Sequence, residues 1–281
     1  MMKKYFVVIL LGLLIGCSSK LAYNNIDWLV YWYMDDYIEL TNQQEAIFDQ
    51  QLVGWIDWHR SEELPKYIQH LQQIRRDVAE NKLTETTITA HYQRLTAHWD
   101  RFRKEISPPL VDIAETLTDE QVIRLFAALE ADNKEREEKI AERQALPPQE
   151  QLDKRIEGMV EDMEARIGSL TTQQRQIVAK FAPQFTASSS LWLGYRRELQ
   201  QQARRLFATR HTRDDFQDKL LALLLDPEHY RSEAFLAAWE HNRTLQARMA
   251  AAIAQTLTAT QKEKLLTDID ELIDDLKGLS G

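Results

Sequence analysis

The sequence predicts an all-α protein, an elongated bundle of about nine or ten antiparallel helices that follows a cleaved signal peptide. Three observations predict this fold class. Apolar side chains recur every three or four residues along most of the chain, as on one face of a helix. One helix-start motif occurs four times, and no stretch alternates like a half-buried strand. The 281 residues are 44% hydrophobic with only 8 Gly and 7 Pro, which rules out a disordered or low-complexity chain.

The first sixteen residues have the three parts of a secretory signal. Lys3 and Lys4 precede an apolar run over residues 5–15, and small residues follow it. The run is shorter than the ~20 apolar residues that span a bilayer. We therefore expect residues 1–16 to be removed, which leaves a mature helical body of residues 17–281.

The only cysteine of the chain follows this signal. Residues 14–17, Leu-Ile-Gly-Cys, resemble the lipobox of bacterial lipoproteins, in which a peptidase cuts before an acylated cysteine. The resemblance implies that Cys17 carries fatty acyl chains, palmitate among them, that hold the body on a membrane. Ser18, in place of Asp, implies sorting to the outer membrane, on its periplasmic side. The alternative is an ordinary secretory signal with an incidental cysteine.

The helices of the body can be placed in chain order. Apolar stripes predict helices over residues 48–59, 65–82, 88–106, 152–167, 192–206, 235–253 and 265–276. Prolines and one glycine mark ends: Pro108-Pro109 and Pro147-Pro148 interrupt helices, Pro183 ends a short one, Asp226-Pro227 opens the helix over 235–253, and Gly278 closes the last. Short connections favour antiparallel neighbours. We predict one body with two possible lobes and a boundary near residues 146–149.

The repeated motif reads L-T-x-x-Q and begins at residues 40, 117, 170 and 257. It predicts a capping box, in which Thr accepts a hydrogen bond from the first turn of the helix and Gln accepts one from the Thr backbone N–H. Each good cap contributes about 1 kcal/mol. Leu83-Thr84 is a fifth, weaker start, because Thr87 stands where Gln would be. The copies are unequally spaced, so they do not indicate a regular solenoid.

Two resemblances follow from these motifs. L-T-x-x-Q at helix starts resembles the periplasmic stress proteins of the Spy and CpxP kind, which are small helical chaperones or inhibitory partners of an envelope sensor. The Cys17 lipobox, the aromatic segment 28–37, residues 58–60 (Trp-His-Arg) and residues 63–67 (Glu-Leu-Pro-Lys-Tyr) together resemble an uncharacterised family of proteobacterial lipoproteins, a domain of unknown function. That resemblance implies location and fold, and it supplies no catalytic residues.

Composition excludes several classes of function. The chain has 35 Lys and Arg against 44 Asp and Glu, a net charge of −9, so no nucleic-acid partner is expected. His59 with Glu63, and His91 with His98, could each share a helix face, but there is no H-E-x-x-H and no thiolate zinc site. We therefore expect no metal, no cofactor and no catalytic residue, and an envelope hydrolase is the least favoured possibility.

An aromatic segment just after the predicted anchor is a candidate surface for a membrane or a partner. It contains Trp28, Tyr31 and Trp32. The favoured alternative is that Trp28 and Trp32, four residues apart, pack onto the bundle. Nearby acidic residues would oppose deep insertion among anionic headgroups: Asp27, Asp35 and Asp36.

A basic helix is the second candidate surface. Four arginines lie on one half of this helix and two more extend the charge beyond it, and together they form a possible patch for an anionic ligand: Arg196, Arg197, Arg204, Arg205, Arg210 and Arg213. In an acidic protein such a patch could bind lipid headgroups, the phosphates of an envelope polymer or an acidic partner. It could equally satisfy acidic helices of the same bundle.

The sequence thus predicts a membrane-anchored envelope lipoprotein that is not an enzyme. We expect it to bind envelope proteins as a scaffold, adaptor or chaperone-like surface. The alternative is a module that binds an anionic envelope polymer or lipid headgroup through the basic helix.

Overall fold

A computed structural model describes residue 23 and residues 25–280 of the chain. These residues fold into helices and their connections, which confirms the all-α prediction. They contain no strand, and none of their helices is both apolar and long enough to span a bilayer. The predicted signal peptide and Cys17 lie outside the described residues.

The helices follow one another with short connections. The first half of the chain forms α3 (Ile26–Met34), α4 (Asn42–Trp58), α5 (Leu64–Ala79), α6 (Glu85–Glu115) and α7 (Asp119–Gln144). The second half forms α8 (Pro148–Ile167), α9 (Thr172–Phe181), α10 (Ser189–Ala208), α11 (Phe216–Leu225), α12 (Glu233–Ala254) and α13 (Ala259–Lys277). A π-helix, η2 (His59–Glu63), joins α4 directly to α5, and two 3-10 turns follow α9 and α11: η3 (Ala182–Gln184) and η4 (Pro227–Tyr230).

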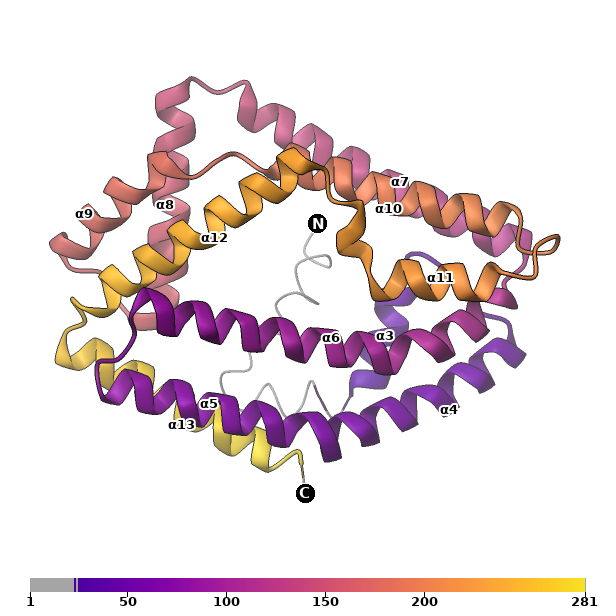
Figure 1. Cartoon of the computed structure of the whole chain (residues 1–281), viewed down its shortest axis with the longest axis horizontal. Coiled ribbons are helices and arrows are strands. Elements are labelled where there is room, and N and C mark those ends of the chain that lie inside the picture. Colours follow the sequence, from indigo (N-terminus) through magenta and orange to yellow (C-terminus); the bar gives the residue numbers. More distant parts are fainter. Residues whose placement is uncertain (1–22, 24, 281) are drawn as a thin grey trace.

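The long helices form the sides of an open frame (Figure 1). The continuous rod α4–η2–α5 runs along its lower side, with α6 beside the rod and α13 against α5. The pair α7 and α10 forms the upper side, while α8, α9 and α12 meet at the left-hand end. Packing of α11 and α12 against α6 closes the frame.

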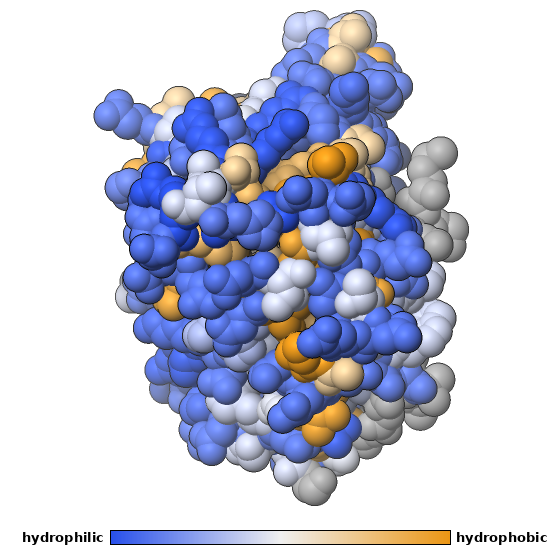
Figure 2. All heavy atoms as spheres, turned by 90° about the vertical axis from the view of Figure 1, so that its right-hand side faces the viewer, coloured by the Kyte–Doolittle hydropathy of each residue, from blue (hydrophilic) through white to orange (hydrophobic). Residues whose placement is uncertain are grey.

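The apolar core is divided among several clusters along this frame. One lies between α6, α10 and α11 and includes Val111, Phe207 and Phe216. Another lies between α8, α9 and α12 and includes Val160 and Val178. Smaller clusters join α5 to α13, and α3 and α4 to α6. At the end that is on the right of Figure 1, the surface is mainly hydrophilic, with apolar side chains in a narrow stripe (Figure 2).

The four L-T-x-x-Q motifs form the predicted capping boxes at the starts of α4, α7, α9 and α13. The structure adds that they meet in pairs. Gln44 Nε2 donates to Gln121 Oε1 over 3.1 Å, and Gln121 Nε2 donates to Gln44 Oε1 over 2.7 Å. Gln174 and Gln261 exchange the same two bonds over 2.8 and 2.9 Å. We call these two pairs the glutamine clasps, and one lies at each end of the frame (Figure 1).

Each clasp satisfies the amide groups of both glutamines. All four side chains are buried. Each Oε1 accepts a bond from its own N-cap backbone N–H as well as from the partner glutamine. Each Nε2 also donates to the backbone carbonyl that precedes the partner motif, and these acceptors are Thr116, Glu39, Thr256 and Ser169. A buried amide with all its partners stabilises the contact, whereas one that lost them would weaken it.

The proline predictions are partly correct. α7 ends before Pro147-Pro148 and α9 ends before Pro183, as predicted. The prediction that Pro108-Pro109 interrupt a helix is wrong, because both lie inside α6. The residues after them, Val111 and Ile113, are buried, and this packing holds the segment helical while α6 bends in its C-terminal part (Figure 1).

One further predicted boundary is displaced, and another is in place with a different conformation. Pro227 opens the short turn η4 and not the helix behind it, since α12 begins at Glu233 with Ser232 as its N-cap. Gly278 follows the last residue of α13, as predicted, with φ −71°, an ordinary right-handed conformation in place of the left-handed one that glycine often adopts at helix ends. The predicted lobe boundary, residues 146–149, falls at the corner between α7 and α8 and stays a prediction.

Candidate functional site

The structure separates the three aromatic residues predicted on α3. The Tyr31 hydroxyl donates to Asp49 over 2.6 Å, and its ring packs edge-on against Phe48 with 5.6 Å between centroids. Trp28 points outward with 60% of its surface exposed, and its ring stacks on half-buried Trp32 at 6.2 Å. Tyr31 therefore packs into the bundle, while Trp28 presents an aromatic face to its surroundings.

The structure also divides the six predicted arginines. Four of them bind acidic groups of the protein itself: Arg196 pairs with Asp132, Arg197 with Glu130 and Glu137, Arg210 with Asp119, and Arg213 with Asp215. Arg210 is buried and also donates to the carbonyls of Phe207 and Leu117. For these four arginines, the structure favours the alternative in which the basic residues pair with acidic groups of the same bundle.

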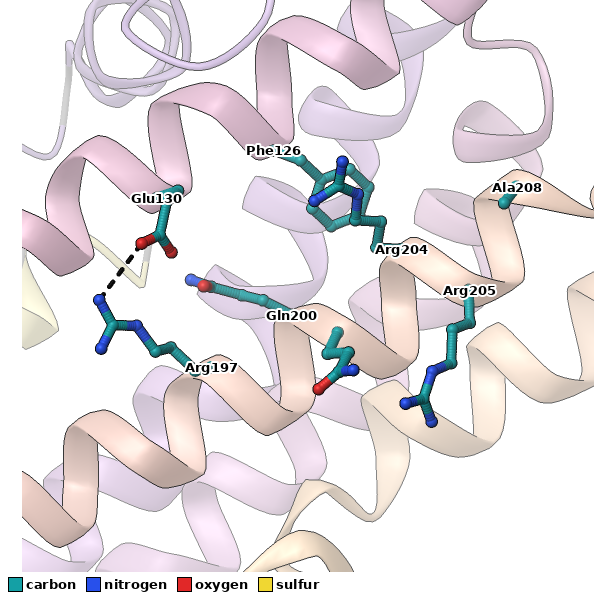
Figure 3. A pocket seen from close by; sticks show the side chains of 8 residues that line it. Phe126, Glu130, Arg197, Gln200, Arg204, Arg205 and Ala208 are labelled. Carbon is teal, nitrogen blue, oxygen red and sulfur yellow. Dashed lines mark hydrogen bonds and ion pairs between the residues drawn. The ribbon is translucent and has the colours of Figure 1, made fainter.

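Arg204 and Arg205 are different. Both are exposed, and neither forms an ion pair within the described part of the chain. They line a groove of about 500 Å³ between α7 and α10, whose other lining residues are Phe126, Glu130, Arg197, Gln200, Gln201 and Ala208. In the view of Figure 3, the Arg204 side chain extends toward α7, which carries Phe126, whereas Arg205 points away from α7. We call this site the α7–α10 groove.

One end of the α7–α10 groove is acidic and fixed in place. Arg197 bridges Glu130 and Glu137 over 3.2 and 2.9 Å. A hydrogen bond from Asn133, together with the charge of Arg197, holds the pKa of Glu130 below its usual value. Gln200 points toward this end and accepts a bond of 2.5 Å from Asn133 (Figure 3). The groove therefore changes from acidic to basic along its length.

A second cluster lies between α5 and α6, and the sequence reasoning found only part of it. Glu63, at the end of η2, is fully buried. Arg101 donates to its two oxygens over 2.7 and 3.1 Å, and Lys66 donates over 2.9 Å. Burial alone would raise the pKa of Glu63, but hydrogen bonds from Arg101, Lys66 and His98 outweigh it and lower the pKa to about 2.

Three stacked imidazoles continue from Glu63. The His70 ring lies between those of His91 and His98, with centroids 5.3 and 5.4 Å away. His70 Nε2 lies 3.1 Å from His91 Nδ1, and His91 Nε2 lies 3.0 Å from Asp77 Oδ2. Burial, reinforced by the charges of His91, His98 and Arg94, lowers the pKa of His70 to about 4. We call this row the histidine seam; it consists of Glu63, His70 and Asp77 with His91 and His98 of α6.

The histidine seam could have been predicted from the spacing of its residues in the sequence. Glu63, His70 and Asp77 are seven residues apart, as are His91 and His98 on the facing antiparallel helix. These are two polar rows at heptad spacing. His59, which the sequence placed on the same helix face as Glu63, has its Nδ1 2.8 Å from the Tyr23 hydroxyl. Across the described residues, no three His, Cys, Asp or Glu side chains are placed to hold a metal ion.

Comparison with known proteins places the chain in a family. A protein family described as a family of unknown function (DUF6279) matches residues 36–235, which include the α7–α10 groove and the histidine seam. No curated protein and no solved structure matches the chain. Because the match covers more than half of the chain, the protein belongs to this family of unknown function.

Proposed function

We propose that the protein is a lipid-anchored envelope protein that binds an acidic segment of a partner protein in the α7–α10 groove and catalyses no reaction itself. The observation that carries the proposal is the pair Arg204 and Arg205, both exposed in the lining of a groove that also contains the apolar ring of Phe126. Among the six arginines of this region, these two keep a charge that no described acidic residue neutralises. Their charge is therefore available to a ligand.

The lining of the groove favours a peptide over a continuous polyanion. Phe126 and Ala208 offer apolar contact, and the amides of Gln200 and Gln201 can bond a peptide backbone. The net charge of −9 for the whole chain would repel a long polyanion. An envelope polymer would find only two cations here, so it remains the second candidate.

The predicted anchor supports the same function. Acylation of Cys17 would confine the body to a membrane surface, where partners in the same envelope meet it at a raised effective concentration. Ser18 after the cysteine supports the periplasmic side of the outer membrane as the location. The capping boxes support the proposed similarity to Spy and CpxP-like proteins, and a chaperone-like surface is one form that partner binding would take.

Binding of a defined acidic peptide tests the proposal. The probe is a fluorescent peptide of alternating Glu and Leu, titrated with the mature protein while anisotropy is followed. We expect saturable binding that weakens with salt, because screening reduces attraction between exposed charges. Replacing both groove cations, Arg204→Glu with Arg205→Glu, is expected to weaken it at least about tenfold, which corresponds to 1.4 kcal/mol. Arg213→Glu, whose wild-type side chain is exposed but paired with Asp215, is the matched control.

Three outcomes would contradict the proposal. The peptide could fail to bind, it could bind the double variant as well as the wild type, or dextran sulfate could displace it at equal charge concentration. The last result would favour the anionic-polymer alternative.

Crosslinking in cells tests the same groove. A photoreactive residue at position 208 should crosslink a partner protein in the wild type, and this crosslink should be absent in the double variant. Mass analysis of the Cys17 peptide tests the anchor separately.

A further inference from the structure

One face of α3 packs against the protein, and this packing determines which face points outward. Val30, Tyr31 and Met34 pack into the cluster around Phe48 and Leu52 of α4. This packing leaves Trp28 exposed on the opposite face with Trp32 stacked beside it. Tyr33 on the same helix is also exposed. Tryptophan and tyrosine combine an apolar ring with a polar edge, a combination that favours the boundary between headgroups and acyl chains.

The length of chain before α3 keeps this face close to the predicted lipid anchor. α3 begins at Ile26, nine residues after Cys17. At ~3.5 Å per residue, that segment reaches about 30 Å at most. A helix of nine residues is about 13 Å long, too short to cross a bilayer but long enough to lie along one.

The charges around α3 indicate which bilayer surface it fits. Asp27 lies in its first turn, Asp35 follows its last residue, and Asp36 comes next, whereas no basic residue lies in its last turn. Anionic headgroups would repel these carboxylates, and zwitterionic headgroups would not. The rings of Trp28 and Trp32 can therefore enter such an interface only to a shallow depth.

We propose that α3 lies on the bilayer that holds the anchor, with Trp28 and Trp32 in the interface of zwitterionic lipid. The inference rests on the lipid anchor of the proposed function and adds a second, specific contact. An anchor at one residue does not by itself set the orientation of the body. Contact through α3 sets one orientation, in which the frame stands at a defined angle to the membrane.

Fluorescence quenching tests this contact. The mature, acylated protein is reconstituted into phosphatidylcholine vesicles that contain lipids brominated near the top of the acyl chains. We expect quenching of tryptophan fluorescence, most of which is lost when Trp28→Ser and Trp32→Ser are combined. Trp99→Ser is the matched control, since Trp99 is a similarly exposed tryptophan (48%) on α6. Replacing part of the lipid with phosphatidylglycerol is expected to reduce the quenching.

The outcomes separate this inference from the proposed function. Helical circular dichroism shows that each variant is folded, and mass analysis of the Cys17 peptide shows whether it is acylated. An acylated, folded protein without quenching, or with quenching unchanged in the double variant, overturns the α3 contact and leaves the anchor intact. A protein without acyl chains on Cys17 overturns the anchor whatever the quenching shows. Stronger quenching in phosphatidylglycerol vesicles would contradict the preference for zwitterionic lipid.

Discussion

At the scale of single residues, Glu63 shows what a buried charge requires in this protein. A carboxylate taken out of water costs several kcal/mol unless other charges and donors meet it. Here η2 turns the side chain inward, where Arg101 binds it through two hydrogen bonds and Lys66 through a third. The depressed pKa of Glu63 shows that the charged form is the stable one. Glu63 therefore binds α6 to the junction of α4 and α5.

Neutralising this residue should destabilise the fold. We expect Glu63→Gln to lower the free energy of unfolding by about 3 kcal/mol, because Arg101 keeps its charge and loses the matching one. Glu62→Gln is the control, since Glu62 is 61% exposed and lies 3.7 Å from the same Lys66. Its loss should cost less than about 1 kcal/mol. Urea unfolding followed by circular dichroism measures the free energy of unfolding of both variants. Equal losses would show that the buried ion pair of Glu63 contributes no more to stability than the exposed one of Glu62.

At the scale of helices, the histidine seam couples the stability of the α5–α6 contact to pH. Burial lowers the pKa values of His70, His91 and His98 from 6.5, so the folded state keeps these rings neutral. Asp77 opposes the shift at His91, while Arg94 strengthens it at His70. Below pH 6.5 the unfolded chain binds more protons than the folded one. Stability from the seam is therefore complete above pH 6.5 and falls as the pH falls toward 4.

The pH dependence can be measured directly. We expect His70 alone to contribute a loss of about 2 kcal/mol in the free energy of unfolding between pH 7 and pH 5. His70→Leu cannot be protonated, so it should flatten this slope, even if it lowers stability at pH 7. His241→Gln, at an exposed position on α12, is the control and should keep the slope of the wild type. A slope unchanged by His70→Leu would contradict the role of the seam.

The helices also show which features the sequence could predict. Apolar stripes and capping boxes act within one helix, so they predicted the fold class and the starts of α4, α7, α9 and α13. Pro108-Pro109 misled the prediction because burial of the following turn outweighs two lost backbone bonds. The continuity of α4 and α5 through η2 was missed for a related reason, since Pro65 suggested a separate helix start.

The candidate sites were less predictable, because they depend on which helices become neighbours. The basic helix was found, but the acidic residues that neutralise four of its arginines lie on other elements or beyond a turn. Only the assembled structure leaves Arg204 and Arg205 available in the α7–α10 groove. The heptad spacing of His70 from Glu63 and Asp77 was visible in the sequence. Its contacts with His91 and His98 could not be predicted, because they depend on the antiparallel pairing of α5 and α6.

At the scale of the whole molecule, the divided core suggests that the two ends of the frame open independently. Each end has its own apolar cluster and its own glutamine clasp. Regions with separate cores unfold locally with different free energies, and hydrogen exchange reports them separately. The clasps are suited to test this, because each joins two helix starts that lie 77 or 87 residues apart in the chain.

Breaking one clasp should therefore loosen one end only. Gln174→Ala removes both bonds between the two glutamines and leaves the Thr171 N–H and the Thr256 carbonyl without a partner, and we expect a loss of about 3 kcal/mol. Hydrogen exchange measured by mass spectrometry should rise in α9 and α13 and stay unchanged in α4 and α7. Gln121→Ala should give the reverse pattern, and exposed Gln217→Ala should change neither end. If either clasp variant raised exchange along the whole chain, the frame would unfold as one cooperative unit, and its two ends could not respond separately to the membrane and to a partner.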